Sequence, residues 1–239
     1  MAYAKEFLLR RGACVAETPN DSVTHLLLGV PSFDPEGQLR GGGSLGDILV
    51  ELPDDVVIMG GNLNHPLTEG YQTVDFLQDE HYLAENAAIT ADCAIPIAQS
   101  KLPTVIPGCP ILVIGWGRIG KCLAAKLKNM GADVTVSVRK ESDHAMLRAL
   151  GFRAEYTNEL CASLGRYRLI FNTVPAPVIR EEQTAYFRED CIKIDLASKP
   201  GIFGREVISA RGLPGIYAPE SSGALIARTA IRHALRKEQ

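Results

Sequence analysis

Three glycines at fixed spacing are the residues of this chain with the clearest chemical meaning. Gly115, Gly117 and Gly120 follow the apolar run ILVI and open the helical stretch RIGKCLAAKL. The first glycine permits a tight turn, the second lets backbone amides approach a pyrophosphate, and the third lets the helix pack on the strand. The diphosphate would lie at the positive end of that helix. The alternative is a glycine-rich turn that binds nothing. We predict a dinucleotide site formed by Gly115, Trp116, Gly117, Arg118, Ile119 and Gly120.

The residue expected beside the adenosine ribose is basic. Where an NAD-binding chain commonly carries Asp or Glu, about 20 residues after the turn, this chain has Arg139, with Ser137 before it and Lys140 after it. A guanidinium cannot accept a bond from the 2′-hydroxyl, but it pairs with a 2′-phosphate. This favours NADP as the cofactor, while NAD stays open because Glu141 is adjacent. The alternative is that Arg139 and Lys140 are a solvent-exposed pair that contacts no cofactor.

Two later strands end in polar residues. In open α/β sheets the carboxyl ends of the strands face the ligand crevice. We therefore expect Asn172, Thr173, Val174 and Pro175, which follow one strand, to lie near the nicotinamide half of the cofactor. Asp195, Ser198 and Lys199 follow the next strand, where an acidic group would orient a substrate or act as a base. The alternative for both segments is a turn in which Asn, Thr or Asp only forms caps.

The second half of the chain alternates between strand and helix patterns. Such alternation is typical of a doubly wound parallel sheet of the Rossmann type. The expected strands are 111–115, 133–138, 152–156, 168–172, 191–197 and the short GIYA segment at 215–218, and the expected helices are 118–130, 143–150, 158–164 and 221–236.

The first half predicts a second, smaller α/β lobe. EFLLRRG reads as a helix closed by Gly12, and ACVAET, HLLLGV and DVVIMGG read as strands. Because an α/β lobe usually opens with a strand and this one opens with a helix, we expect a truncated lobe whose first strand is lost or supplied from elsewhere. Between the lobes we expect a helix capped by Thr90 and kinked at Pro96. A cleft between the lobes is the expected ligand site.

These patterns divide the chain into four segments. We predict an N-terminal lobe at 1–84, an interlobe helix and linker at 85–110, a dinucleotide-binding domain at 111–220 and a C-terminal helix at 221–239. An unpaired sheet edge in the truncated lobe would invite strand pairing, which predicts a homodimer or larger assembly.

Composition narrows the class of protein. The 239 residues are 46% hydrophobic with a net charge of −3, and no long basic run indicates a nucleic-acid partner. No apolar stretch approaches the roughly 20 residues that span a bilayer, and the first residues lack the order of a secretory signal, so we expect a cytoplasmic protein without membrane partners. The six cysteines lack metal-site spacing, which predicts reduced, structural thiols and no metal.

Four motifs together carry a family resemblance. VIGWGRIG, NTVP, IDLASKPG and GLPGIYAPESSG occur in this order and resemble the dehydrogenase-type A subunits of dipicolinate synthases over about residues 85–237. The first lobe is similar more loosely, through PSFDPEGQLRGGG. The resemblance implies a spore-associated, NAD(P)-dependent oxidation of a dihydrodipicolinate-type cyclic dicarboxylate to dipicolinate, together with a flavoprotein-like B subunit. It also implies that substrate and catalysis involve Asn86, Thr90, Asp195, Ser198 and Lys199.

Two alternatives to that activity stay open. The short first lobe, and Glu220 at a place where a dicarboxylate would favour a cation, fit a catalytically silent dinucleotide-binding regulatory or scaffold protein. A divergent 2-hydroxyacid dehydrogenase-like enzyme is the other alternative. It is disfavoured because the loop before the last helix holds none of the five histidines.

Overall fold

The chain folds into two compact units, each with its own parallel sheet. A computed structural model describes residues 1–34, 36 and 38–235, so Pro35, Gly37 and the end of the predicted last helix lie outside the described residues. One unit is Met1–Asn86 together with the chain from Ala218 onward, and the other is Ala87–Tyr217. Parallel sheets with crossover helices confirm the predicted α/β fold class.

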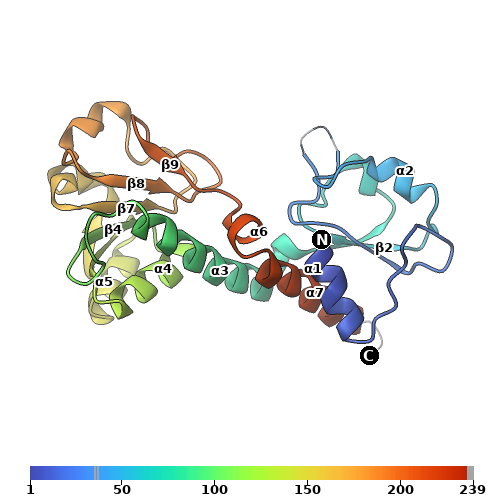
Figure 1. The fold of residues 1–239 in the computed structure, drawn as a ribbon. Helices are drawn as coiled ribbons and strands as arrows, with labels where there is room; N and C mark the ends of the chain where they lie inside the picture. The colour runs from blue at the N-terminus through green and yellow to red at the C-terminus, as the bar shows by residue number, and fades with distance from the viewer. Residues whose placement is uncertain (35, 37, 236–239) are drawn as a thin grey trace. The chain divides into compact units, whose positions relative to one another are not determined.

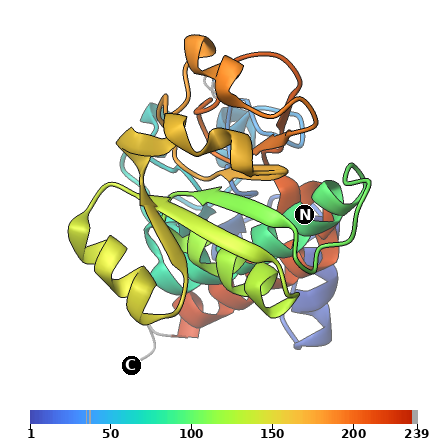
Figure 2. The same ribbon diagram turned by 90° about the vertical axis from the view of Figure 1, so that its left-hand side faces the viewer.

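The larger unit contains a sheet of six parallel strands in the order β6-β5-β4-β7-β8-β9 (Figure 2). Counted from β4, this is the order 3-2-1-4-5-6 of doubly wound dinucleotide-binding folds. Ligands of such sheets bind where the order reverses, which here is at the carboxyl ends of β4 and β7. The strands are β4 (Pro110–Ile114), β5 (Asp133–Val138), β6 (Arg153–Tyr156), β7 (Leu169–Asn172), β8 (Ile192–Asp195) and β9 (Val207–Ser209).

Helices cover this sheet and explain its apolar centre. Ile111–Ile114 of β4 are fully buried, as expected for a parallel strand that is covered on both faces. α4 and α5 lie on one face of the sheet, and the 3-10 helix η5 lies on the other (Figures 1 and 2). The helical segments are α3 (Glu80–Gln99), α4 (Arg118–Asn129), α5 (Glu141–Ala149), η3 (Thr157–Ala162), η4 (Leu164–Arg166), η5 (Glu181–Tyr186) and α6 (Leu213–Tyr217).

The smaller unit has a three-stranded parallel sheet with β2 in the centre. α1 and α7 lie side by side (Figure 1), because Gly223 of α7 allows close approach: a Cβ there would lie 2.7 Å from Cβ of Tyr3. The elements of this unit are β1 (His25–Leu27), β2 (Val57–Gly60), β3 (Gln72–Asp75), α1 (Ala2–Arg10), α2 (Leu45–Leu49), α7 (Pro219–Leu235) and the 3-10 helices η1 (Pro66–Thr68) and η2 (Phe76–Gln78).

Several predicted elements were wrong. ACVAET does not form a strand, because residues 13–18 pair with no neighbouring strand in the described structure. Thr90 is not a helix cap: α3 begins at Glu80, after Asp79, whose carboxylate accepts bonds from the amides of His81 and Tyr82. GIYA lies mostly in the short helix α6, and β9, which was not predicted, forms the edge of the sheet instead. The helix expected at 158–164 consists of 3-10 turns.

Candidate functional site

The turn after β4 has a backbone shape that requires glycine at two places. Gly115 has φ of +102°, and a Cβ there would lie 2.7 Å from Oγ1 of Thr173 and 2.8 Å from Cγ2 of Val174. A Cβ at Gly120 would clash with the carbonyl oxygen of Gly115. The strand, the turn and α4 are therefore packed as closely as a dinucleotide-binding turn needs. Thr173 also donates a hydrogen bond to the carbonyl oxygen of Ile114 at 2.9 Å, which joins the ends of β4 and β7.

The second glycine faces open space instead. A Cβ at Gly117 would meet no atom within 4 Å, and Gly117 is the exposed N-cap residue of α4. Gly117 has no side chain that could cap this helix end, which leaves room for a ligand to bond the amides of the first turn of α4. The positive end of a helix with uncapped amides suits a phosphate group. This arrangement fits the diphosphate of a dinucleotide.

Trp116 and Ile119 complete the turn without filling it. The Trp116 ring packs edge-on against Phe152, with ring centroids 5.7 Å apart, and Nζ of Lys121 lies 5.9 Å from the Trp116 ring centroid. Ile119 is half-buried, and Arg118, the first residue of α4, is exposed. These contacts direct the large side chain of the turn toward the protein rather than into the space beside Gly117.

Basic side chains follow β5, as the sequence predicts. Arg139 and Lys140 are both exposed, and no ion pair joins either of them to another residue in the described parts of the chain. Ser137 differs from this expectation, because its side chain is fully buried and its hydroxyl faces Oγ1 of Thr157 at 3.4 Å. Its carbonyl oxygen accepts a bond from the amide of Gly115 at 2.9 Å. Ser137 therefore ties β5 to the turn, and Arg139 follows two residues later.

Asn172 and Asp195 form a buried polar pair at the ends of β7 and β8. Asn172 is fully buried and Asp195 is 2% exposed. Nδ2 of Asn172 donates to Oδ1 of Asp195 at 2.9 Å and to the carbonyl oxygen of Val174 at 3.0 Å, while its Oδ1 accepts from the amide of Val174. The Asn172 side chain therefore fixes the first residues of the loop after β7.

The carboxylate of Asp195 fixes the next loop in the same way. Besides the bond from Asn172, it accepts bonds from the amides of Ala197, Gly201 and Ile202, at 3.1, 2.7 and 3.1 Å. A carboxylate that is this enclosed and accepts four hydrogen bonds is suited to positioning a loop rather than to exchanging a proton with a substrate. This is the capping role that the sequence left open for Asp195, although the three amides that donate to it could not be named from the sequence.

Gly201 joins the two loops and is the residue that sequence reasoning undervalued. A Cβ at Gly201 would clash with Nδ2 of Asn172 and lie 2.7 Å from the carbonyl oxygen of Val174. Its own carbonyl oxygen accepts bonds from the amides of Val178 and Ile179, at 2.8 and 3.0 Å. The only feature of the sequence that points to this role of Gly201 is its place in the turn SKPG. The loops after β7 and β8 thus form one rigid shelf.

The remaining predicted residues lie at different places. Pro175, Ser198 and Lys199 are exposed on the shelf. Asn86 and Thr90 are one helical turn apart on α3, and Thr90 is buried. The larger unit brings together the glycine turn, Thr173, Val174 and the shelf. Asn86 belongs to the smaller unit, so its position relative to that group stays a prediction.

Three of the six cysteines are buried in the structure. Burial raises the pKa of Cys191 to about 11, and burial likewise raises the pKa of Cys93 and Cys109, which disfavours their thiolates as nucleophiles. Among the residues that the structure describes, no group of three His, Cys, Asp or Glu side chains could hold a metal ion. Likewise, none of the described helices combines the length and apolar character needed to cross a membrane.

Comparison with known proteins agrees with a dehydrogenase-type fold. No protein family model matches the chain. NADP-dependent alcohol dehydrogenase C 1 of Mycolicibacterium smegmatis is 31% identical over 123 residues, which are 46% of this chain and 35% of that protein. The similarity therefore covers only part of either protein.

The chain is also similar to the A subunit of dipicolinate synthase, which confirms the resemblance seen in the motifs. The Bacillus subtilis protein is 28% identical over 150 residues, which are 59% of this chain and 50% of that protein. The crystal structure of the A subunit from Bacillus halodurans superimposes with a TM-score of 0.81 at 24% identity, covering 91% of this chain and 81% of the other. The chain thus shares the fold of these proteins, while its match spans about half the length of the Bacillus subtilis protein.

Proposed function

We propose that the chain is an NADP-dependent oxidoreductase that converts a dihydrodipicolinate-type cyclic dicarboxylate to dipicolinate. The observation that carries this proposal is the open space beside Gly117 at the start of α4, next to a turn whose packing leaves no room for a side chain at Gly115 or Gly120. The similarity to the A subunit of dipicolinate synthase supports the choice of substrate.

In this proposal the amides of the glycine turn hold the diphosphate, and Arg139 pairs with the 2′-phosphate of NADP. NAD would leave the Arg139 guanidinium without that partner. The shelf formed by Asn172 to Pro175 and by the loop after β8 supports the nicotinamide half. Because Gly201 and Asp195 lock this shelf, the cofactor would meet a surface that needs no rearrangement.

The chemistry proposed is transfer of a hydride and loss of a proton. NADP supplies the hydride acceptor when bound. The ring of the substrate gives up a hydride from one carbon and a proton from a neighbouring atom, and it becomes aromatic. Lys199 and Ser198, which are exposed on the shelf, would bind a carboxylate of the substrate. Asn86 and Thr90 of α3 are also proposed as substrate-binding residues. Asp195 would position Ser198 and Lys199 through the loop.

The proposed assembly follows the same similarity. We propose a flavoprotein-like B subunit for the partner, a homo-oligomer of this chain, a role in sporulation and a cytoplasmic location. Nucleic acid and membrane are not proposed as partners. The similar proteins are named as the A component of a synthase, which is the reason to expect a second component.

A spectroscopic assay tests the proposed reaction. The chain is mixed with NADP, dihydrodipicolinate and a B subunit, and absorbance of the reduced nicotinamide is followed. The matched control is Gly117→Trp, because a Cβ at position 117 meets open space and the added indole would occupy the place of the phosphates. We expect turnover by the natural chain and at least a hundredfold less by the variant.

Two other outcomes would contradict the proposal. Tight NADP binding by the natural chain without reduction of the nicotinamide would favour the silent regulatory or scaffold protein. Equal turnover by the natural chain and by Gly117→Trp would mean that the glycine turn does not hold the cofactor. Circular dichroism of the variant shows whether it is folded, so that a lost signal can be assigned to the site.

A further inference from the structure

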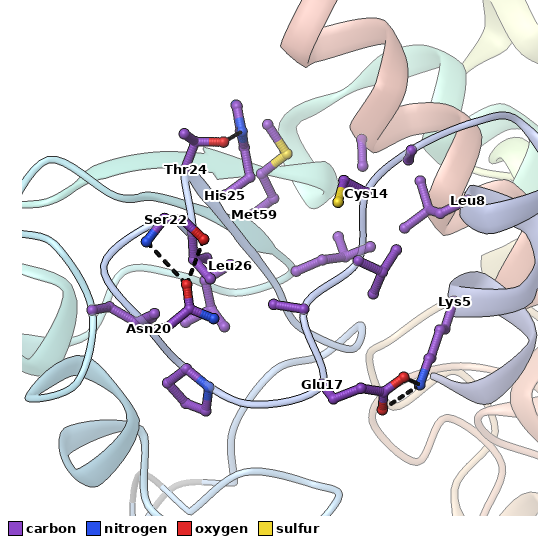
Figure 3. Close-up of a pocket in the computed structure, with 18 of the residues that line it drawn as sticks. Lys5, Leu8, Cys14, Glu17, Asn20, Ser22, Thr24, His25, Leu26 and Met59 are labelled. Atoms are coloured by element: carbon purple, nitrogen blue, oxygen red, sulfur yellow. Dashed lines mark hydrogen bonds and ion pairs between the residues drawn. The ribbon is translucent and has the colours of Figure 1, made fainter.

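A large hollow in the smaller unit is independent of the proposed dinucleotide site. It has a volume of about 810 Å³ and lies between β1 and the segment 13–17 that follows α1. Figure 3 shows Cys14 and Glu17 on one side of the hollow and Thr24 and Leu26 on the other. All of its lining residues belong to one unit, so the hollow does not depend on how the two units are placed.

One wall of the hollow is the edge of the three-stranded sheet. The carbonyl oxygen of Thr24 accepts from the amide of Val57, and the amide of Leu28 donates to the carbonyl oxygen of Met59. In a parallel pair, alternate residues direct their backbone groups to the same neighbour. Leu27 therefore directs its amide and carbonyl away from β2, toward the hollow. This edge of β1 pairs with no other strand in the described chain.

The opposite wall is an extended segment without a partner. The amide of Ala13 bonds to the carbonyl oxygen of Leu8 at the end of α1, and Nζ of Lys5 pairs with the Glu17 carboxylate at 2.6 Å. Between these two fixed points, the backbone groups of Cys14–Ala16 make no hydrogen bond to any described residue. The sequence ACVAET nevertheless has the composition of a strand.

The floor and roof of the hollow are apolar. Leu8 of α1, Ile231 of α7, and Ile48 and Leu52, in and after α2, line it. The helices α1 and α7 lie on one side of the small sheet and α2 lies on the other (Figure 1). A central strand of a parallel sheet is covered by helices on both faces of the sheet. The hollow therefore has the surroundings that such a strand would have. A small apolar molecule would fill this space but offer no hydrogen bonds to the backbone groups of the two walls.

We propose that this hollow is an acceptor groove for an added β-strand. Its occupant is an extended, apolar segment of a partner polypeptide, about four or five residues long at about 3.3 Å per residue. The segment pairs with Leu27 on one edge and with Cys14–Ala16 on the other, so that ACVAET becomes a strand.

A second copy of the chain is a poor source for this segment. The apolar runs best suited to a covered parallel strand, residues 111–114 and 134–138, are buried in the sheet of the larger unit. Inserting either of them would require that sheet to unfold. An apolar segment of another polypeptide could enter the groove without unfolding the sheet of the larger unit.

Hydrogen–deuterium exchange with a synthetic peptide tests the acceptor groove. The probe is the peptide Lys-Lys-Ile-Leu-Val-Ile-Gly. Its last five residues copy residues 111–115, which form the end of β4 and the first residue of the turn, because β4 is a strand with helices on both faces. The two lysines are added for solubility. We expect at least tenfold slower exchange, with the peptide, of the Leu27 amide and of those amides of Cys14–Ala16 that face the groove. Alkylation of the exposed Cys14 thiol should slow as well, since Cys14 lines the groove.

Two controls separate strand pairing from general apolar binding. The same peptide with N-methylated leucine and valine lacks the amides needed for pairing and should bind at least tenfold more weakly. In the protein, Ala16→Pro removes one pairing amide at an exposed position, whereas Ala16→Ser keeps it. The exchange of β2 and β3 amides, which belong to the same unit as Ala16, shows whether each variant is folded.

Three results would overturn the proposal. The first is no slowing of exchange at Leu27 and Cys14–Ala16 at millimolar peptide. The second is equal binding of the N-methylated peptide, which would indicate a site for apolar ligands. The third is a slowing of exchange at the same amides, without peptide, as the concentration of the protein itself is raised. Such a result would assign the groove to a second copy of the chain. None of these readouts involves NADP, so they are separate from a failure of the proposed oxidoreductase.

Discussion

Arg139 is the side chain on which the choice between the two nicotinamide cofactors rests. It is exposed at the end of β5, two residues after Ser137, whose carbonyl oxygen holds the glycine turn. Its position was predictable, because the distance from a glycine turn to the end of the following strand is set by one helix and one strand. The burial of Ser137 was not predictable, since the side chain that faces it comes from Thr157, 20 residues later.

Replacing Arg139 with Ala should weaken NADP binding about tenfold to a hundredfold, because a hydrogen bond to a charged group contributes about 1.5–3 kcal/mol. NAD binding should change little. Calorimetric titration with each cofactor measures both values. Arg148→Ala is the matched control, since Arg148 is another exposed arginine in the same unit, on α5. An equal loss of affinity for both cofactors in Arg139→Ala would show that Arg139 does not contact the 2′-phosphate.

Asp195 has two expected roles, as a group acting on a substrate or as the cap of a turn, and its hydrogen bonds in the structure are those of a cap. The structure has it buried at the end of β8, as its place in the sequence predicts. Its four hydrogen bonds come from three backbone amides and one Asn side chain. The loop geometry that supplies those amides depends on Gly201, and no local pattern in the sequence specifies it.

At the scale of elements, the start of α3 is held by a buried carboxylate. Asp79 accepts bonds from the amides of His81 and Tyr82, and its Oδ2 lies 2.7 Å from both Arg232 and His233 of α7. Its side chain is 8% exposed. Burial by itself raises the pKa of Asp79, but the hydrogen bonds from Tyr82, His233 and Arg232 together outweigh it and hold the pKa well below 3.8.

Because the folded pKa of Asp79 is lowered, its contribution to stability is present above about pH 4 and is lost as pH falls below that value. Asp79→Asn should therefore lower the free energy of unfolding by about 1–3 kcal/mol at pH 7, and this difference should narrow from pH 4 toward pH 2. Denaturant unfolding at several pH values measures it.

The control for Asp79 is Glu85→Gln. Glu85 also joins α3 to α7, through Arg228 at 2.7 Å, but its side chain is 47% exposed. An exposed ion pair contributes about 0–1 kcal/mol. If the Asp79 and Glu85 variants lost equal stability, or if the loss in Asp79→Asn did not depend on pH, burial of the Asp79 pair would not be the cause.

Elements were predictable where their signal is local. β4, α4 and β5 lie within one or two residues of their expected bounds, because apolar runs and glycines mark both ends. ACVAET failed because a strand needs a neighbour as well as a composition. The start of α3 was missed by about ten residues, because the polar sequence EHYLAEN hides the continuous helix that Asp79 begins.

At the scale of the whole molecule, the chain consists of two compact units with separate sheets. Each unit has its own core, so we expect two unfolding transitions in calorimetry. NADP should raise the midpoint of one transition only, because the glycine turn and the shelf belong to the larger unit. At a hundred times the dissociation constant the added stability is about 2.7 kcal/mol.

Limited proteolysis assigns the two transitions, since each unit gives different fragments. Gly117→Trp should show both transitions and lose the response to NADP. A cofactor that raised the midpoint of the unit containing β1 to β3, and left the other unchanged, would contradict the assignment of the site to the larger unit.

The helix α7 gives the chain an unusual order of assembly. It packs on α1 in the smaller unit, although the whole of the larger unit separates the two helices in sequence. Domains usually fold during synthesis from the N-terminus onward. Here residues 87–217 can acquire their structure on the ribosome while α1, which is made before them, still lacks the surface that it covers. The residues of α1 therefore reach their native surroundings later than residues made after them.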